Sequence, residues 1–74
     1  MERTLHLNAT VIPDTELGGY VARAVEVEVA SQGETVEEAV ANLREALELY
    51  FEDEETPELP TLTMLAPVDV RLPA

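Results

Sequence analysis

Apolar residues recur with a helical period over residues 35–51. The spacings of three and four join Val36, Ala39, Val40, Leu43, Ala46, Leu47, Tyr50 and Phe51. On a helix these positions form one apolar stripe that leaves the glutamates outside it. Thr35 and Glu38 have the spacing of a capping box, in which each side chain accepts a free backbone N–H. The pattern predicts an amphipathic helix that needs a surface to cover, because an isolated helix of this length is marginal in water.

Two segments before this helix alternate between apolar and polar residues, as half-buried strands do. Residues 3–12 place Leu5, Leu7, Ala9 and Val11 on one face. Gly18-Gly19 then marks a turn. The second alternating run, residues 20–30, is longer than most strands. A bend near residues 25–28 would divide it in two, although no glycine or proline marks the position.

The chain changes character after the helix. Pro57 and Pro60 would end the helix and open a linker over residues 53–60. An alternating apolar pattern then predicts a last strand over about residues 61–72. We therefore expect one α+β domain over residues 1–74, with its core in residues 3–53. Its element order is β-β-β-α-β, with one main helix on a face of a three- to four-stranded, mostly antiparallel sheet.

The charge of the chain restricts its partners. Sixteen acidic residues against four arginines and no lysine give a formal net charge of −12. Such a chain repels phosphate backbones, so we expect no direct contact with nucleic acid. A basic partner would instead be attracted. For acidic proteins in general, the more common explanation of such acidity is that it keeps a small, apolar-rich protein in solution.

Small size points to self-association. Seventy-four residues without cysteine have neither a disulfide nor a thiolate metal site to support a small core. We therefore expect a homodimer or a higher homo-oligomer. Val68, Val70 and Leu72 are the candidate contact residues, because a short apolar edge strand is a ready pairing surface. The first residues lack the apolar stretch of a secretory signal, and no apolar run could span a membrane, so we expect a cytoplasmic protein.

No residue pattern matches a catalytic, cofactor or metal site. His6 has neither a cysteine nor a nearby acid, and a structural or surface role fits it better than ligation. Ser31 lacks a nucleophile motif, and the glycines stand isolated in turns rather than forming a phosphate cradle. We predict a protein that is not an enzyme and has no cofactor. A residual metal-dependent nuclease that uses Asp14 and Glu26 is a minor alternative.

Two groups of acids are candidates for binding a cationic partner. Glu26 and Glu28 would share a strand face with Ala22, Ala24 and Ala30, whose small side chains would leave a shallow surface. An ordinary solvated face is an equal alternative. The second group is Glu52, Asp53, Glu54 and Glu55, at the helix end. The helix dipole disfavours carboxylates there by a few tenths of a kcal/mol each, and a basic partner would offset that cost.

Two motifs resemble the HicB-like antitoxin family. They are Gly-Gly-Tyr-Val-Ala at residues 18–22 and Ser-Gln-Gly-Glu-Thr-Val-Glu-Glu-Ala at residues 31–39. The helix is similar to the family pattern at Ala39, Asn42, Leu43, Glu45, Ala46, Leu47, Leu49 and Tyr50. The resemblance covers roughly residues 4–53.

The resemblance implies a partial ribonuclease H-like fold and a protein that binds and neutralises a small, basic, mRNA-cleaving toxin of the HicA type. Active enzymes of that fold carry a metal-binding acid in the first strand, and residues 3–12 contain none. Residues 25–29 replace the family's proline- and glycine-containing turn, and no residues follow Ala74 to form a DNA-binding module. Operator binding is therefore not expected. An orphan oligomeric domain with a regulatory role and no toxin is the alternative.

Overall fold

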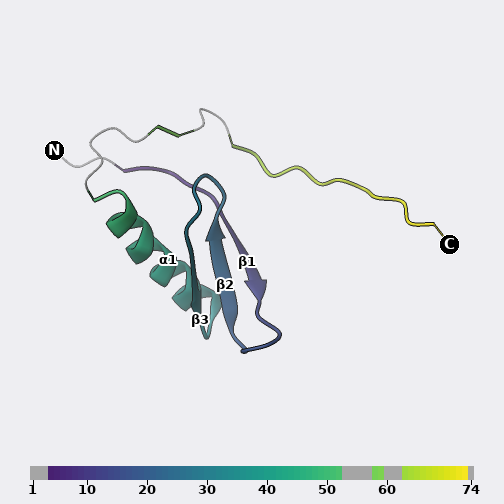
Figure 1. The fold of residues 1–74 in the computed structure, drawn as a ribbon, viewed down its shortest axis with the longest axis horizontal. Coiled ribbons are helices and arrows are strands. Elements are labelled where there is room, and N and C mark those ends of the chain that lie inside the picture. Colours follow the sequence, from purple (N-terminus) through teal and green to yellow (C-terminus); the bar gives the residue numbers. More distant parts are fainter. Residues whose placement is uncertain (1–3, 53–57, 60–62, 74) are drawn as a thin grey trace.

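The computed structural model describes residues 4–52, 58–59 and 63–73. Over these residues the elements are β1 (Ala9–Pro13), β2 (Tyr20–Ala24), β3 (Ala30–Gly33) and α1 (Val36–Tyr50). The strands form an antiparallel sheet in the order β1-β2-β3, and α1 packs across one of its faces (Figure 1). The predicted α+β class, with one helix on an antiparallel sheet, is confirmed.

The turn between β1 and β2 is built by Asp14 and two glycines. The Asp14 carboxylate accepts the backbone N–H groups of Glu16 and Leu17, each at 3.0 Å. Gly18 and Gly19 have φ angles of 81° and 76°, a region that glycine occupies without a steric cost. The turn therefore lies where the sequence predicts it.

β1 starts later than the sequence pattern indicates. The alternation predicts a strand over residues 3–12, but β1 begins at Ala9, which pairs with Ala24 at the end of β2. Residues 4–8 continue past that end. In the described part of the chain no strand lies beside residues 4–8, so they do not form part of the sheet.

The long alternating run is divided by a bend at residues 25–28, which is one of the two arrangements that the pattern allows. Across the bend, the N–H of Ala24 donates a hydrogen bond to the carbonyl of Val29 at 2.9 Å. Inside it, the N–H of Val29 donates to the carbonyl of Val27 at 3.0 Å. Local backbone bonds therefore turn the chain without a glycine or a proline.

The predicted shallow surface beside Glu26 and Glu28 is wrong. Both residues lie in the bend at residues 25–28 rather than on a strand face. Ala22 and Ala24 are buried beneath α1, with 0% and 5% of their surface exposed. Their small side chains allow the helix to approach the sheet closely, which is the physical reason that this face is covered.

The helix begins and ends where its local signals predict. The hydroxyl of Thr35 accepts the N–H of Glu38 at 3.0 Å. The carboxylate of Glu38 accepts the N–H of Glu34 at 3.0 Å, one residue earlier than in the standard capping box. At the other end, Phe51 is the C-cap, and its N–H donates to the carbonyl of Leu47.

Two residues fasten α1 to β3. A Cβ added at Gly33 would lie 2.5 Å from the backbone nitrogen of Ala39, so only glycine fits between strand and helix. The side-chain amide of Asn42 donates to the carbonyl of Gln32 at 2.8 Å. Asn42 lies outside the predicted apolar stripe, yet it is half-buried and joins the two layers.

The core is small. Its buried apolar residues are Ala22, Ala24, Ala39 and Leu43. No large side chain in the described residues is fully buried. The domain therefore has little internal support by itself.

The predicted last strand is absent from the sheet. Residues 63–73 are extended, carry no strand and run away from helix and sheet (Figure 1). An extended segment becomes a strand only when another strand pairs with its backbone, and no such pairing is formed over these residues. Residues 61 and 62 lie outside the described residues.

Candidate functional site

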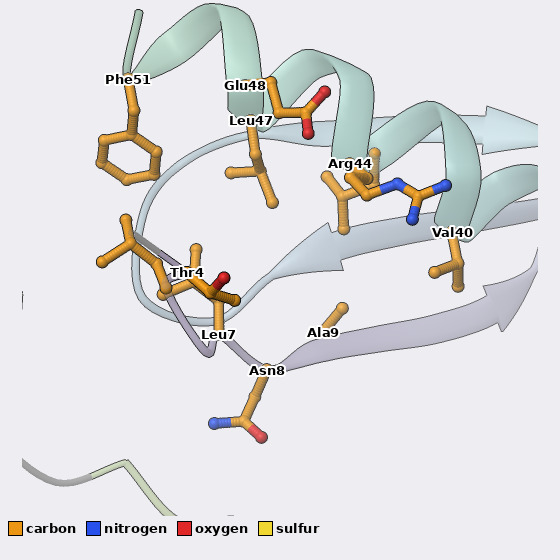
Figure 2. Close-up of a pocket in the computed structure, with 11 residues that line it drawn as sticks. Thr4, Leu7, Asn8, Ala9, Val40, Arg44, Leu47, Glu48 and Phe51 are labelled. Carbon is orange, nitrogen blue, oxygen red and sulfur yellow. The ribbon is translucent and has the colours of Figure 1, made fainter. Parts of the chain in front are cut away.

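An open groove separates α1 from the start of the chain. It has a volume of about 580 Å³ and is lined on one side by Thr4, Leu5, Leu7, Asn8 and Ala9. From the helix, Val40, Leu47 and Phe51 point toward that segment (Figure 2). The groove arises because the apolar stripe of α1 is wider than the sheet beneath it: Val40 remains 43% exposed. The groove lies on the β1 side, where β1 is the outer strand of the described sheet.

The rim of the groove is polar. Arg44 and Glu48 line it from α1, and Asn8 lines it from the other side with its side chain directed away from the helix (Figure 2). An apolar floor with a few polar groups at the edge suits an apolar peptide segment better than a small charged ligand. Sequence periodicity could not reveal this groove, because the width of the sheet depends on tertiary pairing.

Glu26 is half-buried, and its carboxylate is hydrogen-bonded within the protein. Its carboxylate accepts the backbone N–H of Asn8 at 3.0 and 3.2 Å and the Asn8 side-chain amide at 2.9 Å. The backbone bond from Asn8 lowers the pKa of Glu26 and outweighs the opposing effect of desolvation, and the side chains of Asn8 and Thr63 add to the lowering. Glu26 therefore fastens the segment before β1 to the bend, and a partner would have to compete with Asn8 for it.

The other predicted binding acids are dispersed. Glu28 is exposed in the bend, and Glu52 is exposed just past the end of α1. Asp53, Glu54 and Glu55 lie outside the described residues. Glu52 is thus the described member of the run predicted at the helix end.

An acidic face on α1 comprises Glu37, Glu45 and Glu48, and Glu52 follows it just past the C-cap Phe51. All four side chains are exposed. At 100° per residue, Glu37, Glu45 and Glu48 fall within about 80° of arc, on the side opposite the buried residues Ala39 and Leu43. Glu37, Glu45 and Glu48 were not among the predicted binding acids, although the same helical period that gives the apolar stripe also gives this face.

The residues weighed for chemistry do not converge. Asp14 follows the end of β1, whereas Glu26 bonds to Asn8 before its start, so about 20 Å of extended chain separates their attachment points. His6 is exposed. Over the described residues, no group of three or more His, Asp or Glu side chains is arranged to hold a metal ion. The two acids of the nuclease alternative are therefore not brought together.

Comparisons with protein-family models, with curated proteins and with solved structures gave no match. Within residues 4–52, 58–59 and 63–73, no helix has the length and apolar character needed to cross a membrane. The features of this chain that bear on its function are therefore the groove, the acidic face and the net charge.

Proposed function

We propose that the protein is an antitoxin-type binding module that binds and neutralises a small, basic, RNA-cleaving toxin of the HicA type. The observation that carries the proposal is the acidic face of α1, which presents three exposed carboxylates, with a fourth at Glu52 just past the helix end, on a chain with a net charge of −12. A surface of one sign attracts an oppositely charged protein and raises its association rate. The resemblance to HicB-like antitoxins supports this class of partner.

The position of the acids supports binding over simple solvation. Glu48 and Glu52 lie at the C-terminal end of α1, and the last turn contains no basic residue. Carboxylates at this end face the negative pole of the helix dipole, which costs a few tenths of a kcal/mol each. Acids that serve only solvation need not be placed there, whereas arginines or lysines of a partner would offset the cost.

The experiment is capture of partners by the tagged protein from its own host at low salt, repeated at high salt and read by mass spectrometry. We expect one small basic protein in stoichiometric amount at low salt, and its loss at high salt because salt screens exposed charge pairs. Recovery of the bait alone would contradict the proposal.

Matched variants locate the contact. Glu45→Gln with Glu48→Gln removes two charges from the acidic face, and Glu16→Gln with Glu34→Gln removes two exposed charges elsewhere. We expect weaker capture by the first pair only. Equal weakening by both pairs would mean that overall charge, and not the helix face, binds the partner.

The second candidate function is an orphan oligomeric domain with a regulatory role and no toxin. The small core and the exposed apolar C-terminal segment favour it, because both are typical of a chain completed by self-association. Recovery of the bait alone as a defined oligomer would support this candidate.

A further inference from the structure

The chain exposes more surface than a compact protein of its mass. Its accessible surface is 6649 Å², whereas a folded monomer of 8.1 kDa exposes about 4,500 Å². Its radius of gyration is 15.0 Å, against about 11 Å for a compact domain of this length. The excess surface of about 2,100 Å² per chain is enough for the interface of an obligate dimer.

The outer edge of β1 offers free backbone groups. The carbonyl of Asn8 accepts the N–H of Val25, so Asn8 turns its backbone toward β2. Because this direction alternates along a strand, Ala9 and Val11 turn their backbone groups to the opposite edge. In the described sheet β1 is an edge strand with nothing paired there. The side chains of Ala9 and Val11 lie on the α1 side, so a strand added at this edge would cover the groove.

The C-terminal segment has the pattern of a strand that lacks its partner. Every second residue is apolar: Met64, Ala66, Val68, Val70 and Leu72. The large side chains among these are between 69% and 79% exposed. The segment points away from its own sheet (Figure 1).

We propose that residues 64–72 of a second copy of this chain fill the groove between β1 and α1 as an added strand. The exchange is reciprocal and produces a twofold dimer. Each copy thereby gains the missing width of its sheet and covers Val40, Leu47 and Phe51. The interface covers the apolar side of α1 and meets the acidic face only at Glu48 on the rim of the groove. It does not depend on the proposed function.

The distribution of charge favours a second copy as the occupant. Residues 4–13 carry no Asp, Glu, Lys or Arg, and residues 63–73 carry one acid and one base. In a chain with a net charge of −12, these are segments through which two copies can meet with little repulsion between carboxylates.

Pro67 determines the direction of the added strand. When the even-numbered apolar residues face α1, an antiparallel strand turns their N–H groups toward β1 and turns the Pro67 nitrogen outward. A parallel strand would turn that nitrogen, which has no hydrogen, toward β1 and lose a ladder bond. The added strand is therefore antiparallel to β1.

The first test is the mass of the purified full chain by light scattering and sedimentation equilibrium. We expect twice the 8.1 kDa chain mass. Val68→Asn with Val70→Asn should raise the dissociation constant at least about a hundredfold, because both side chains enter the groove. Asp69→Asn with Arg71→Gln is the matched control: it alters the opposite face of the same segment, leaves the net charge unchanged and should remain dimeric. A monomeric wild type, or a dimer indifferent to the valine changes, overturns the proposal.

The second test alters the receiving edge. Ala9→Pro removes an N–H that points away from β2, so it spares the three-stranded sheet but blocks the added strand. We expect a folded monomer by circular dichroism. Mixed with the Val68→Asn, Val70→Asn chain, it should form a mixed dimer, because one intact groove and one intact segment remain. Failure to form that dimer, with both variants folded, overturns exchange between chains.

A third measurement does not depend on those variants folding. Leu72→p-benzoylphenylalanine places a photocrosslinking side chain on the groove side of the segment. Illumination should give a covalent dimer whose link maps to residues 4–11 or to α1. A link formed only within one chain would show that the segment folds back on itself and would overturn the proposal, as would a link to any other surface.

Discussion

Glu26 shows at the scale of one residue how an acid can serve the fold rather than a partner. Its carboxylate is held by Asn8, and these bonds lower its pKa below the ordinary value of 4.5. A lowered pKa in the folded state means that the stabilisation is present above the unfolded pKa and is lost as the pH falls through the folded pKa.

We predict that Glu26→Gln lowers the free energy of unfolding at neutral pH and flattens its decline below about pH 4.5. The cause is loss of the charged acceptor for the Asn8 N–H. Urea unfolding at a series of pH values measures both effects. Glu28→Gln, exposed in the same bend, is the control and should keep the wild-type pH profile. Identical profiles for the two variants would contradict the assignment.

Gly33 carries a second prediction at this scale. Gly33→Ala should lower the free energy of unfolding by about 1–3 kcal/mol, because the new Cβ meets the backbone of Ala39 and forces α1 from the sheet. Gly18→Ala adds a Cβ into open space and should cost only the strain of its positive φ, about 1–2 kcal/mol. Thermal and urea unfolding compare the two. Wild-type stability in Gly33→Ala would show that the close approach is not needed.

At the scale of the element, α1 carries acidic residues at both ends, and the helix dipole affects the two ends in opposite ways. Its N-terminal turn carries acids where the helix dipole favours them, and its C-terminal end carries acids where the dipole does not. The second arrangement is understandable if a basic partner binds there, as proposed.

We predict that Glu48→Gln with Glu52→Gln raises the free energy of unfolding by a few tenths of a kcal/mol per residue and weakens binding of a basic partner. Glu37→Gln, in the first turn, should weaken binding too but should lower stability slightly. Urea unfolding and a binding titration separate the two quantities. Stability changes of one sign for both variants would contradict the dipole account.

The elements also show which features the sequence could predict. The bounds of α1 follow from a local cap and a local stripe, so they are readable along the chain. The covered face of β2 cannot be read from the sequence, because the apolar residues of β2 alternate in the same way whether its valines or its alanines are buried. The packing of Ala22 against Ala39 and Leu43 of α1 decides which face is covered, and this is a tertiary contact. The prediction of a last strand was wrong for the same reason, because an alternating segment does not specify the sheet edge with which it pairs.

At the scale of the whole molecule, charge and packing oppose each other. The carboxylates of a chain with a net charge of −12 repel one another, while the largest buried side chain among the described residues is that of Leu43. Salt should therefore strengthen the fold while it weakens any complex with a basic partner.

We predict that the midpoint of thermal unfolding rises between 0.01 M and 0.1 M salt, as the Debye length falls from about 30 Å to about 10 Å. Sodium and potassium chloride should act alike, because screening does not distinguish the cations. A midpoint that falls, or that rises with one cation only, would contradict screening of the net charge.

The central claim is that this acidic protein neutralises a basic toxin, and the most direct measurement is a titration of RNA cleavage. The captured basic protein is mixed with increasing amounts of the purified chain, and cleavage of a messenger RNA is followed. The account predicts a linear loss of cleavage that is complete at one equivalent, and a shallower loss with Glu45→Gln and Glu48→Gln. Cleavage that continues unchanged in excess protein would contradict the claim.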